Sequence, residues 1–217
     1  MDINQINDLV AEGIQLTRLW NNPESTGRYY HNGKHSQMAH DYFFEIAVKA
    51  YLNQRISYDE ILLGRLAMAW HDVIQGQGST QNETKSADLL AKDMVRYAFS
   101  PDQINQAREL ILGTITSFDE QGYMHQRAEL IATPLALLVA DADLCSLGAP
   151  APKFVLMSQR LIMEFAGKTD LSPEEWQKGW AGQVKFMTGR TFLTPEANER
   201  WGLRLAQNFE LAKTLAQ

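Results

Sequence analysis

The segment at residues 35–50, HSQMAHDYFFEIAVKA, places apolar side chains at steps of three and four residues. On a helix this spacing brings Met38, Tyr42 and Ile46 to the same face as His35. An amphipathic helix buries its apolar face. We therefore expect a helix from about residue 35 to 52, with His35 pointing into the core.

The same periodicity extends in both directions along the chain. It predicts helices at about residues 2–20, 57–73, 82–99, 101–118, 127–148, 151–167, 173–188 and 195–215. Loops are expected at residues 21–27 and 76–80, where glycine, proline and small polar residues gather. No segment alternates long enough to predict a sizeable sheet. The sequence thus predicts an all-α fold, formed as a single domain over residues 1–217.

Three of these helix starts carry a local signal, a Ser or Thr cap followed by proline. Proline is favoured in the first turn of a helix because the amide hydrogen it lacks has no partner there. The three pairs are Ser100-Pro101, Ser172-Pro173 and Thr194-Pro195.

Composition and charge exclude several classes of protein. The chain is 45% hydrophobic and 21% charged, as in an ordinary globular domain. Its net charge of −6 argues against a general nucleic-acid-binding surface. The first ten residues, MDINQINDLV, do not predict a secretory signal, and the longest apolar stretch is much shorter than the ~20 residues of a membrane span. We expect a cytoplasmic protein with no membrane contact.

The polar residues that fall in apolar helices predict a metal site. His35, His71 and Asp143 all lie on core-facing sides of their predicted helices, and Asp72 follows His71 directly. A buried carboxylate must pair, take up a proton or bind a cation. The single cysteine, Cys145, excludes a cysteine-rich zinc site, so imidazole and carboxylate would bind the ion.

Two aspartates compete for the last ligand position. Asp141 and Asp143 are two residues apart, about 200° around a helix, so both should not bind one ion. Periodicity alone leaves either as the ligand.

The order His35, His71-Asp72, Asp143 resembles the HD superfamily of metal-dependent phosphohydrolases. The segments AWHD (69–72), NETKSA (82–87) and DADLCSLG (141–148) are similar to a bacterial group of predicted HD phosphohydrolases, and Arg160, Glu164-Phe165 and Gly189-Arg190 resemble its C-terminal half. The resemblance implies an HD-type helical bundle, with a metal-site core at about 28–148 and additional C-terminal helices at about 150–217. It favours Asp143 as the ligand, with Asp141 as the alternative.

The segment Tyr30-His31-Asn32, followed by His35, is similar to a motif of cyclic-nucleotide phosphodiesterases. That similarity implies that His31 is the general acid that protonates the leaving oxygen. Those enzymes have a further histidine shortly after the His-Asp pair, where this chain has Gln75 and Gly76. A second metal site and cyclic-nucleotide specificity are therefore not expected.

The implied reaction is hydrolysis of a phosphate ester, either a nucleotide or a small phosphorylated metabolite. One divalent ion would polarise the phosphoryl group and lower the pKa of water; Mn, Mg, Fe, Zn, Co and Ni all suit His and Asp ligands. Glu83 is a candidate to orient the water. Arg28, Lys34 and Lys85 are candidates to bind phosphate.

Two other functions fit the same residues. A di-iron oxygenase of the HD type needs more histidines between Asp72 and Asp143, where the sequence offers only His125. A non-catalytic, ligand-binding or regulatory HD module would not need the complete set of ligands that is present here. No feature of the sequence indicates an oligomeric state.

Overall fold

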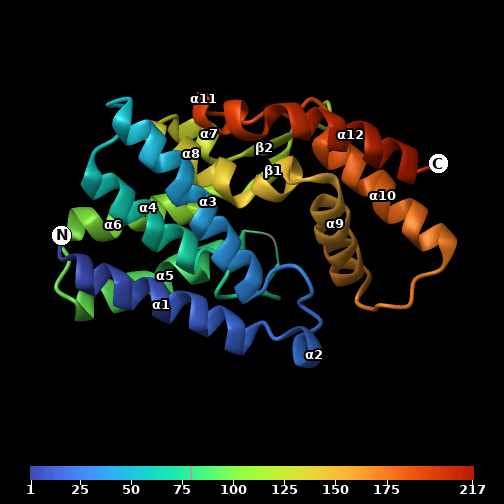
Figure 1. The fold of residues 1–217 in the computed structure, drawn as a ribbon. Helices are drawn as coiled ribbons and strands as arrows, with labels where there is room; N and C mark the ends of the chain where they lie inside the picture. The colour runs from blue at the N-terminus through green and yellow to red at the C-terminus, as the bar shows by residue number, and fades with distance from the viewer. Residues whose placement is uncertain (79) are drawn as a thin grey trace.

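The computed structural model describes residues 1–78 and 80–217 and confirms the all-α expectation (Figure 1). The first half contains α1 (Ile3–Trp20), α2 (Pro23–Thr26), α3 (Gly33–Leu52), α4 (Tyr58–Trp70), α5 (Gln81–Arg96) and α6 (Pro101–Gly113). Next come β1 (Thr116–Phe118), β2 (Met124–Gln126), α7 (Ala128–Ile131), α8 (Pro134–Asp143) and the 3-10 turn η1 (Cys145–Gly148). The last elements are α9 (Ala151–Ala166), α10 (Pro173–Met187), α11 (Pro195–Ala197), the π-helical turn η2 (Asn198–Gly202) and α12 (Leu203–Leu215).

The three Ser/Thr-Pro pairs begin helices as predicted. Ser100, Ser172 and Thr194 each accept a hydrogen bond at the N-terminus of the helix that follows. A proline at the first position of each helix removes one of the first-turn amide hydrogens that would lack a helical partner. Local sequence chemistry therefore predicted where these helices start.

Four expectations differ from the structure. The helix predicted at 101–118 ends at Gly113, because residues 116–118 pair instead with residues 124–126 in a small antiparallel sheet. The helix predicted at 127–148 is interrupted at Ala132, whose φ of 55° is left-handed, and resumes at Pro134. The π-helical turn interrupts the helix predicted at 195–215, and the loop predicted at 21–27 contains the one-turn helix α2. Residue 79, in the loop expected at 76–80, lies outside the described residues.

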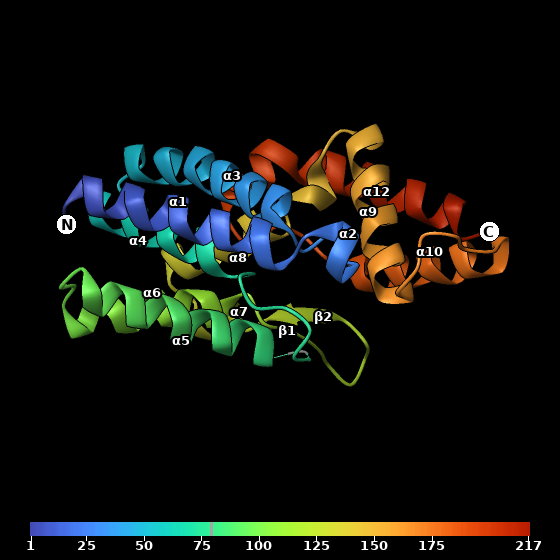
Figure 2. The same cartoon turned by 90° about the horizontal axis from the view of Figure 1, so that it is seen from below.

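Helix α4 lies at the centre of the first half and contacts α1, α3, α5, α6 and α8. In Figure 2, α1 and α3 lie on one side of α4 and α8, while α5 and α6 lie on the other. Trp70, at the end of α4, is fully buried, and its Nε1 donates a hydrogen bond to the backbone oxygen of Leu9 at 2.8 Å. The end of α4 is thereby fixed against α1.

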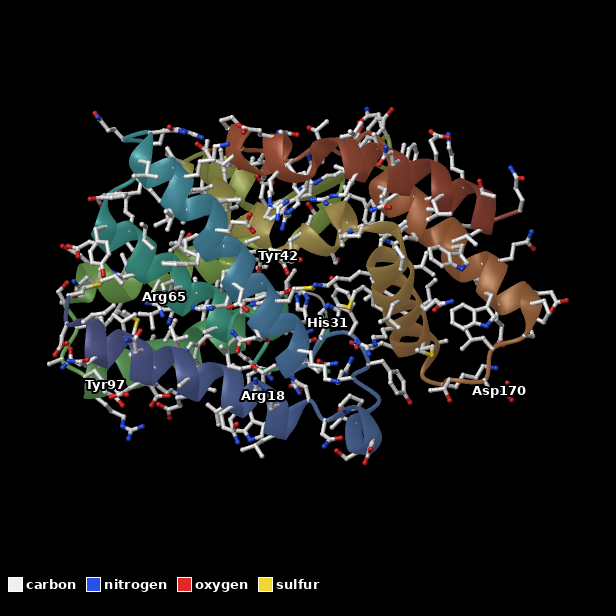
Figure 3. All side chains as sticks on the ribbon, viewed as in Figure 1. Arg18, His31, Tyr42, Arg65, Tyr97 and Asp170 are labelled. Atoms are coloured by element: carbon white, nitrogen blue, oxygen red, sulfur yellow. The ribbon has the colours of Figure 1, made fainter. Side chains whose placement is uncertain are left out.

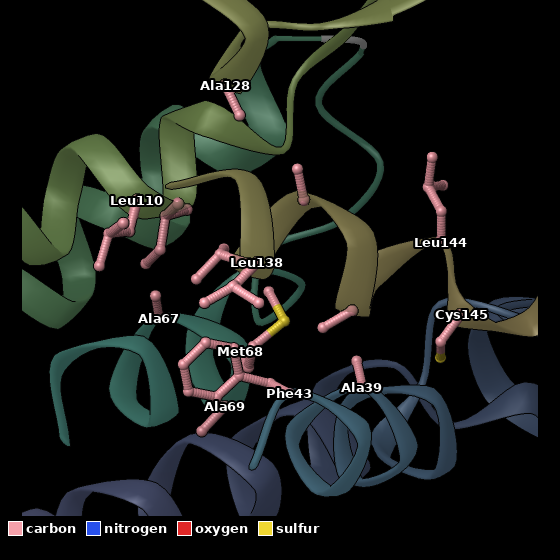
Figure 4. Packing of buried hydrophobic residues seen from close by; sticks show 14 of the residues in the cluster. Ala39, Phe43, Ala67, Met68, Ala69, Leu110, Ala128, Leu138, Leu144 and Cys145 are labelled. Atoms are coloured by element: carbon pink, nitrogen blue, oxygen red, sulfur yellow. The ribbon is translucent and has the colours of Figure 1, made fainter. Parts of the chain in front are cut away.

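A close helix contact lies at the middle of α3 and α4. Phe43 is fully buried in the cluster that Figure 4 shows around Met68 and Leu138. A Cβ atom at Gly64 would lie 2.0 Å from Cζ of Phe43, so only glycine permits this approach. The packing of Phe43 on α4 sets the position of α3, the helix that begins with the predicted ligand His35.

The C-terminal helices form the other end of the molecule. Figures 1 and 2 both place α9, α10 and α12 toward the end of the molecule opposite the N-terminus, with α2 near α9. In the described part of the chain, no helix combines the length and apolarity needed to cross a membrane.

Candidate metal centre

Three helix ends meet at the predicted metal site. His35 lies in the first turn of α3, which Asn32 caps by accepting a hydrogen bond from the amide of Lys34. His71 is the C-terminal cap of α4, and Asp143 is the last residue of α8. The two imidazoles are each only 1% exposed. Burial of α3, α4 and α8 against one another therefore brings these side chains together.

The distances define one compact cluster. Nε2 of His35 lies 3.3 Å from both Oδ2 of Asp72 and Oδ1 of Asp143. Nε2 of His71 lies 3.2 Å from the same two oxygens and 3.4 Å from Nε2 of His35. His35, His71 and Asp143 present ligand atoms that all lie within 4.8 Å of one another, and they could hold a metal ion.

The hydrogen bonds of the cluster fit a cation. Nδ1 of His71 lies 2.8 Å from the backbone oxygen of Met68, and a carbonyl can only accept, so Nδ1 carries the hydrogen. In the neutral ring, Nε2 of His71 then directs its lone pair into the cluster, as in metal-binding histidines. Among the described residues, the buried Oδ2 of Asp72 has no hydrogen-bond partner. A divalent ion would satisfy both atoms.

The ring of His35 is held by packing. Its Nδ1 is buried without a hydrogen-bond partner among the described residues. The ring of Tyr30 packs on it, with 4.6 Å between centroids, and the hydroxyl of Tyr30 lies 2.8 Å from Oγ of Ser146. This contact fixes the ring so that Nε2 faces the cluster.

The imidazoles and carboxylates of the cluster shift one another's pKa. Burial alone would lower the pKa of His71, but the carboxylates of Asp72 and Asp143 outweigh burial and raise it well above its ordinary value. Burial alone would raise the pKa of Asp143, but its hydrogen bonds to the two imidazoles outweigh this effect and lower it to about 2. The carboxylates are therefore ionised and hold positive charge between them, either as protons or as a metal ion.

Asp141 has a different environment, although it is only two residues from Asp143. It is fully buried, and Oδ1 accepts a hydrogen bond from the amide of Leu193 at 2.7 Å. Oδ2 accepts from the amide and the hydroxyl of Thr194, at 2.8 and 2.7 Å. Both oxygens hold the start of α11, and Asp143, rather than Asp141, joins the cluster.

His31 lies beside the cluster and is held by Glu164 of α9 (His31 is labelled in Figure 3). Nδ1 of His31 is 2.7 Å from Oε1 of Glu164, while Oε2 accepts from the amides of Tyr30 and His31 at 2.8 and 3.0 Å. Burial alone would lower the pKa of His31, but the charges of Asp72 and Glu164 outweigh burial and raise it. With Nδ1 bonded to Glu164, Nε2 is the nitrogen left to act in the cavity.

Sequence reasoning did not assign a role to Glu164. Its only signal was a weak resemblance around Arg160 and Phe165, and no local pattern connects it to His31. The carboxylate of Glu164 is almost fully buried and also accepts a hydrogen bond from Nη1 of Arg28 at 3.3 Å. Both Arg28 and His31 are thus tied to α9.

A cavity of about 640 Å³ opens over the cluster. His31, His71, Asp72, Glu83 and Asp143 all lie on its wall. Oε2 of Glu83 is buried without a hydrogen-bond partner among the described residues, and burial raises its pKa. A base in this state, beside the cluster, is placed to accept a proton from water.

The predicted phosphate-binding residues do not line this cavity. Arg28 pairs with Glu164, and Lys85 is exposed with its Nζ bonded to Gln77. Lys34 is exposed on the first turn of α3. The structure therefore brings together His31, Glu83 and the four predicted ligands, but not these three basic residues.

The two remaining histidines lie outside the cavity. Nε2 of His40 accepts a hydrogen bond from Nε of Arg65 at 3.3 Å. Nδ1 of His125 lies 2.9 Å from Glu129, and its Nε2 lies 3.1 Å from Asp119, both at the surface. His125 therefore adds no ligand to the cluster.

Comparison of the chain with protein-family models, with curated proteins and with solved structures finds no significant match.

Proposed function

We propose that this protein is a metal-dependent phosphohydrolase that cleaves a phosphate ester with water. One observation carries the proposal: two imidazoles and two carboxylates converge on a point at the wall of a cavity, next to a histidine held by a buried carboxylate. Neutral imidazole and carboxylate suit a range of divalent ions.

His35, His71, Asp72 and Asp143 would hold the ion, which supplies charge stabilisation for the phosphoryl oxygens and a lower pKa for water. Glu83 accepts a proton from the attacking water, because its raised pKa makes it a stronger base than an ordinary carboxylate. The water oxygen forms a bond to phosphorus as the bond between phosphorus and the alcohol oxygen breaks.

His31 makes the second proton transfer, to the leaving alcohol oxygen. Its protonated form donates from Nε2 to the departing alcohol oxygen, while Glu164 keeps hold of Nδ1 and stabilises the positive ring. The products are the free alcohol and inorganic phosphate. The residues thus account for both proton transfers that the reaction requires.

The test is phosphate release by protein stripped of metal and then supplied with Mn, Mg, Co or Ni. We expect release from a panel of phosphate esters with at least one ion, and its loss in Asp72→Ala. Lys85→Ala, an exposed change outside the cavity, serves as the control and should retain release. Undiminished release in a folded Asp72→Ala variant, or iron-dependent oxygen consumption without phosphate release, would contradict the proposal.

A further inference from the structure

The wall of the cavity beyond the metal cluster is apolar. Leu161, Ile162 and Phe165 contribute from α9, and Phe186 contributes from α10. Phe118 of β1 packs edge-on against Phe186, with 6.5 Å between ring centroids. Apolar side chains from three separate elements therefore surround the space next to the site where a phosphoryl group would lie.

Two of these rings are unusually open to solvent. Phe165 is 79% exposed and Phe118 is 49% exposed, and both line the cavity. A large apolar side chain on a cavity wall contributes binding free energy when a ligand covers it. These rings favour a ligand with an apolar or aromatic body.

The charged residues of the wall indicate how many phosphoryl groups the ligand carries. Among the described residues that line the cavity, Lys178 is the one lysine or arginine, whereas the acidic residues are Asp72, Glu83, Asp143 and Glu175. Enzymes that bind a chain of phosphates surround it with several cations and amide donors. Here the wall adds Glu83 and Glu175, and Glu175 is already paired with Lys168 at 2.8 Å, so the described wall offers no cluster of cations for additional phosphates.

From these observations we infer that the substrate is a monophosphate ester of an apolar or aromatic alcohol, whose alcohol portion lies between α9, α10 and β1. The inference rests on the proposed function, because the metal cluster is taken to receive the phosphoryl group. A cavity of about 640 Å³ is within the range of sites that enclose drug-sized ligands. A nucleoside triphosphate is the competing ligand that the charges disfavour.

The test compares methyl, butyl and octyl phosphate with ATP. The three alcohols have similar leaving-group pKa values, so differences in kcat/KM report binding of the alkyl chain. Burial of each methylene can raise kcat/KM up to about fourfold, and we expect octyl phosphate to exceed butyl phosphate by at least about tenfold. Equal values for all chain lengths, or a preference for ATP, would overturn the inference.

Binding to metal-free protein separates this inference from the proposed function. Isothermal titration with octyl and butyl phosphate should show at least about tenfold tighter binding of the octyl ester. If this difference is found and no ester is hydrolysed, the proposed function fails and the assignment of the apolar subsite holds. If hydrolysis is found and neither binding nor kcat/KM depends on chain length, the proposed function stands and the inference fails.

Gly182 offers a way to fill the subsite. It lines the cavity on α10, and a Cβ atom built there meets no other atom within 4 Å. Gly182→Leu places a side chain in the space of the alkyl group and raises helix propensity. We expect the ratio of kcat/KM for octyl over butyl phosphate to fall at least about fivefold.

The matched control is Ala181→Leu, which introduces the same side chain at the neighbouring exposed position, outside the cavity. This variant should retain the parent's ratio. An unchanged ratio in Gly182→Leu, with circular dichroism matching that of the parent, would overturn the inference.

Discussion

Nδ1 of His31 and Oε1 of Glu164 lie 2.7 Å apart, although 133 residues separate them in the chain. The same carboxylate also accepts hydrogen bonds from the backbone amides of Tyr30 and His31. The position of the candidate acid therefore depends on α9, which also forms a wall of the cavity.

Glu164→Gln should shift the pH dependence of phosphate release. The amide oxygen can still accept a hydrogen bond from His31, although the amide nitrogen would face a donor, and the negative charge that helps to raise the pKa of His31 is removed. A general acid acts only when protonated, so activity is lost as pH rises through its pKa. A lower pKa moves the basic limb of the kcat/KM profile to lower pH, and we expect activity at neutral pH to fall about tenfold or more. The profile of the parent, measured in the same buffers, is the reference, and an identical basic limb in both proteins would contradict this role.

Replacing Asp143 and replacing Asp141 should have different effects on metal content. Asp143→Asn should reduce the metal content after dialysis, measured by mass spectrometry, because it removes one of the candidate ligand oxygens. Asp141→Asn should leave the metal content intact but lower that free energy by about 1–3 kcal/mol, because its amide nitrogen would face a backbone or hydroxyl donor. Loss of metal from Asp141→Asn with unchanged stability would reverse the assignment.

Addition of Mn or Zn should raise the melting temperature of the metal-stripped protein. An ion that binds only the folded state stabilises it by about 2.7 kcal/mol at one hundred times its Kd. His71→Ala should abolish this rise, measured by scanning calorimetry. His125→Gln alters a histidine at the surface and should preserve it. Equal rises in the two variants would place the ion elsewhere.

Gly64→Ala should lower the free energy of unfolding by about 1–3 kcal/mol, because the added Cβ would overlap the ring of Phe43. The matched change Gly182→Ala, at an open position of α10, should raise that free energy by about 0.4–1 kcal/mol. Urea denaturation measures both changes. A neutral Gly64→Ala would show that α3 and α4 can separate without loss of stability.

Local chemistry was enough to predict the helical fold and the His and Asp residues that form the candidate metal cluster. The periodicity around His35 and the Ser-Pro pairs act within a few residues of the chain, so they can be interpreted without the partners on other helices. The same periodicity placed His35, His71 and Asp143 on buried faces, and the structure brings them together.

Tertiary packing decided the rest. Residues 116–118 pair with residues 124–126 in a sheet instead of continuing a helix. Leu193 and Thr194 donate three hydrogen bonds to Asp141, so Asp143 is the aspartate that lies in the cluster. Glu164 reached His31 only because α9 packs beside the N-terminal end of α3. Each of these outcomes depends on contacts between distant segments, and a local sequence pattern does not predict the free energy of such contacts. The physical reason is that periodicity fixes which face of a helix is buried, whereas packing fixes which residues meet there.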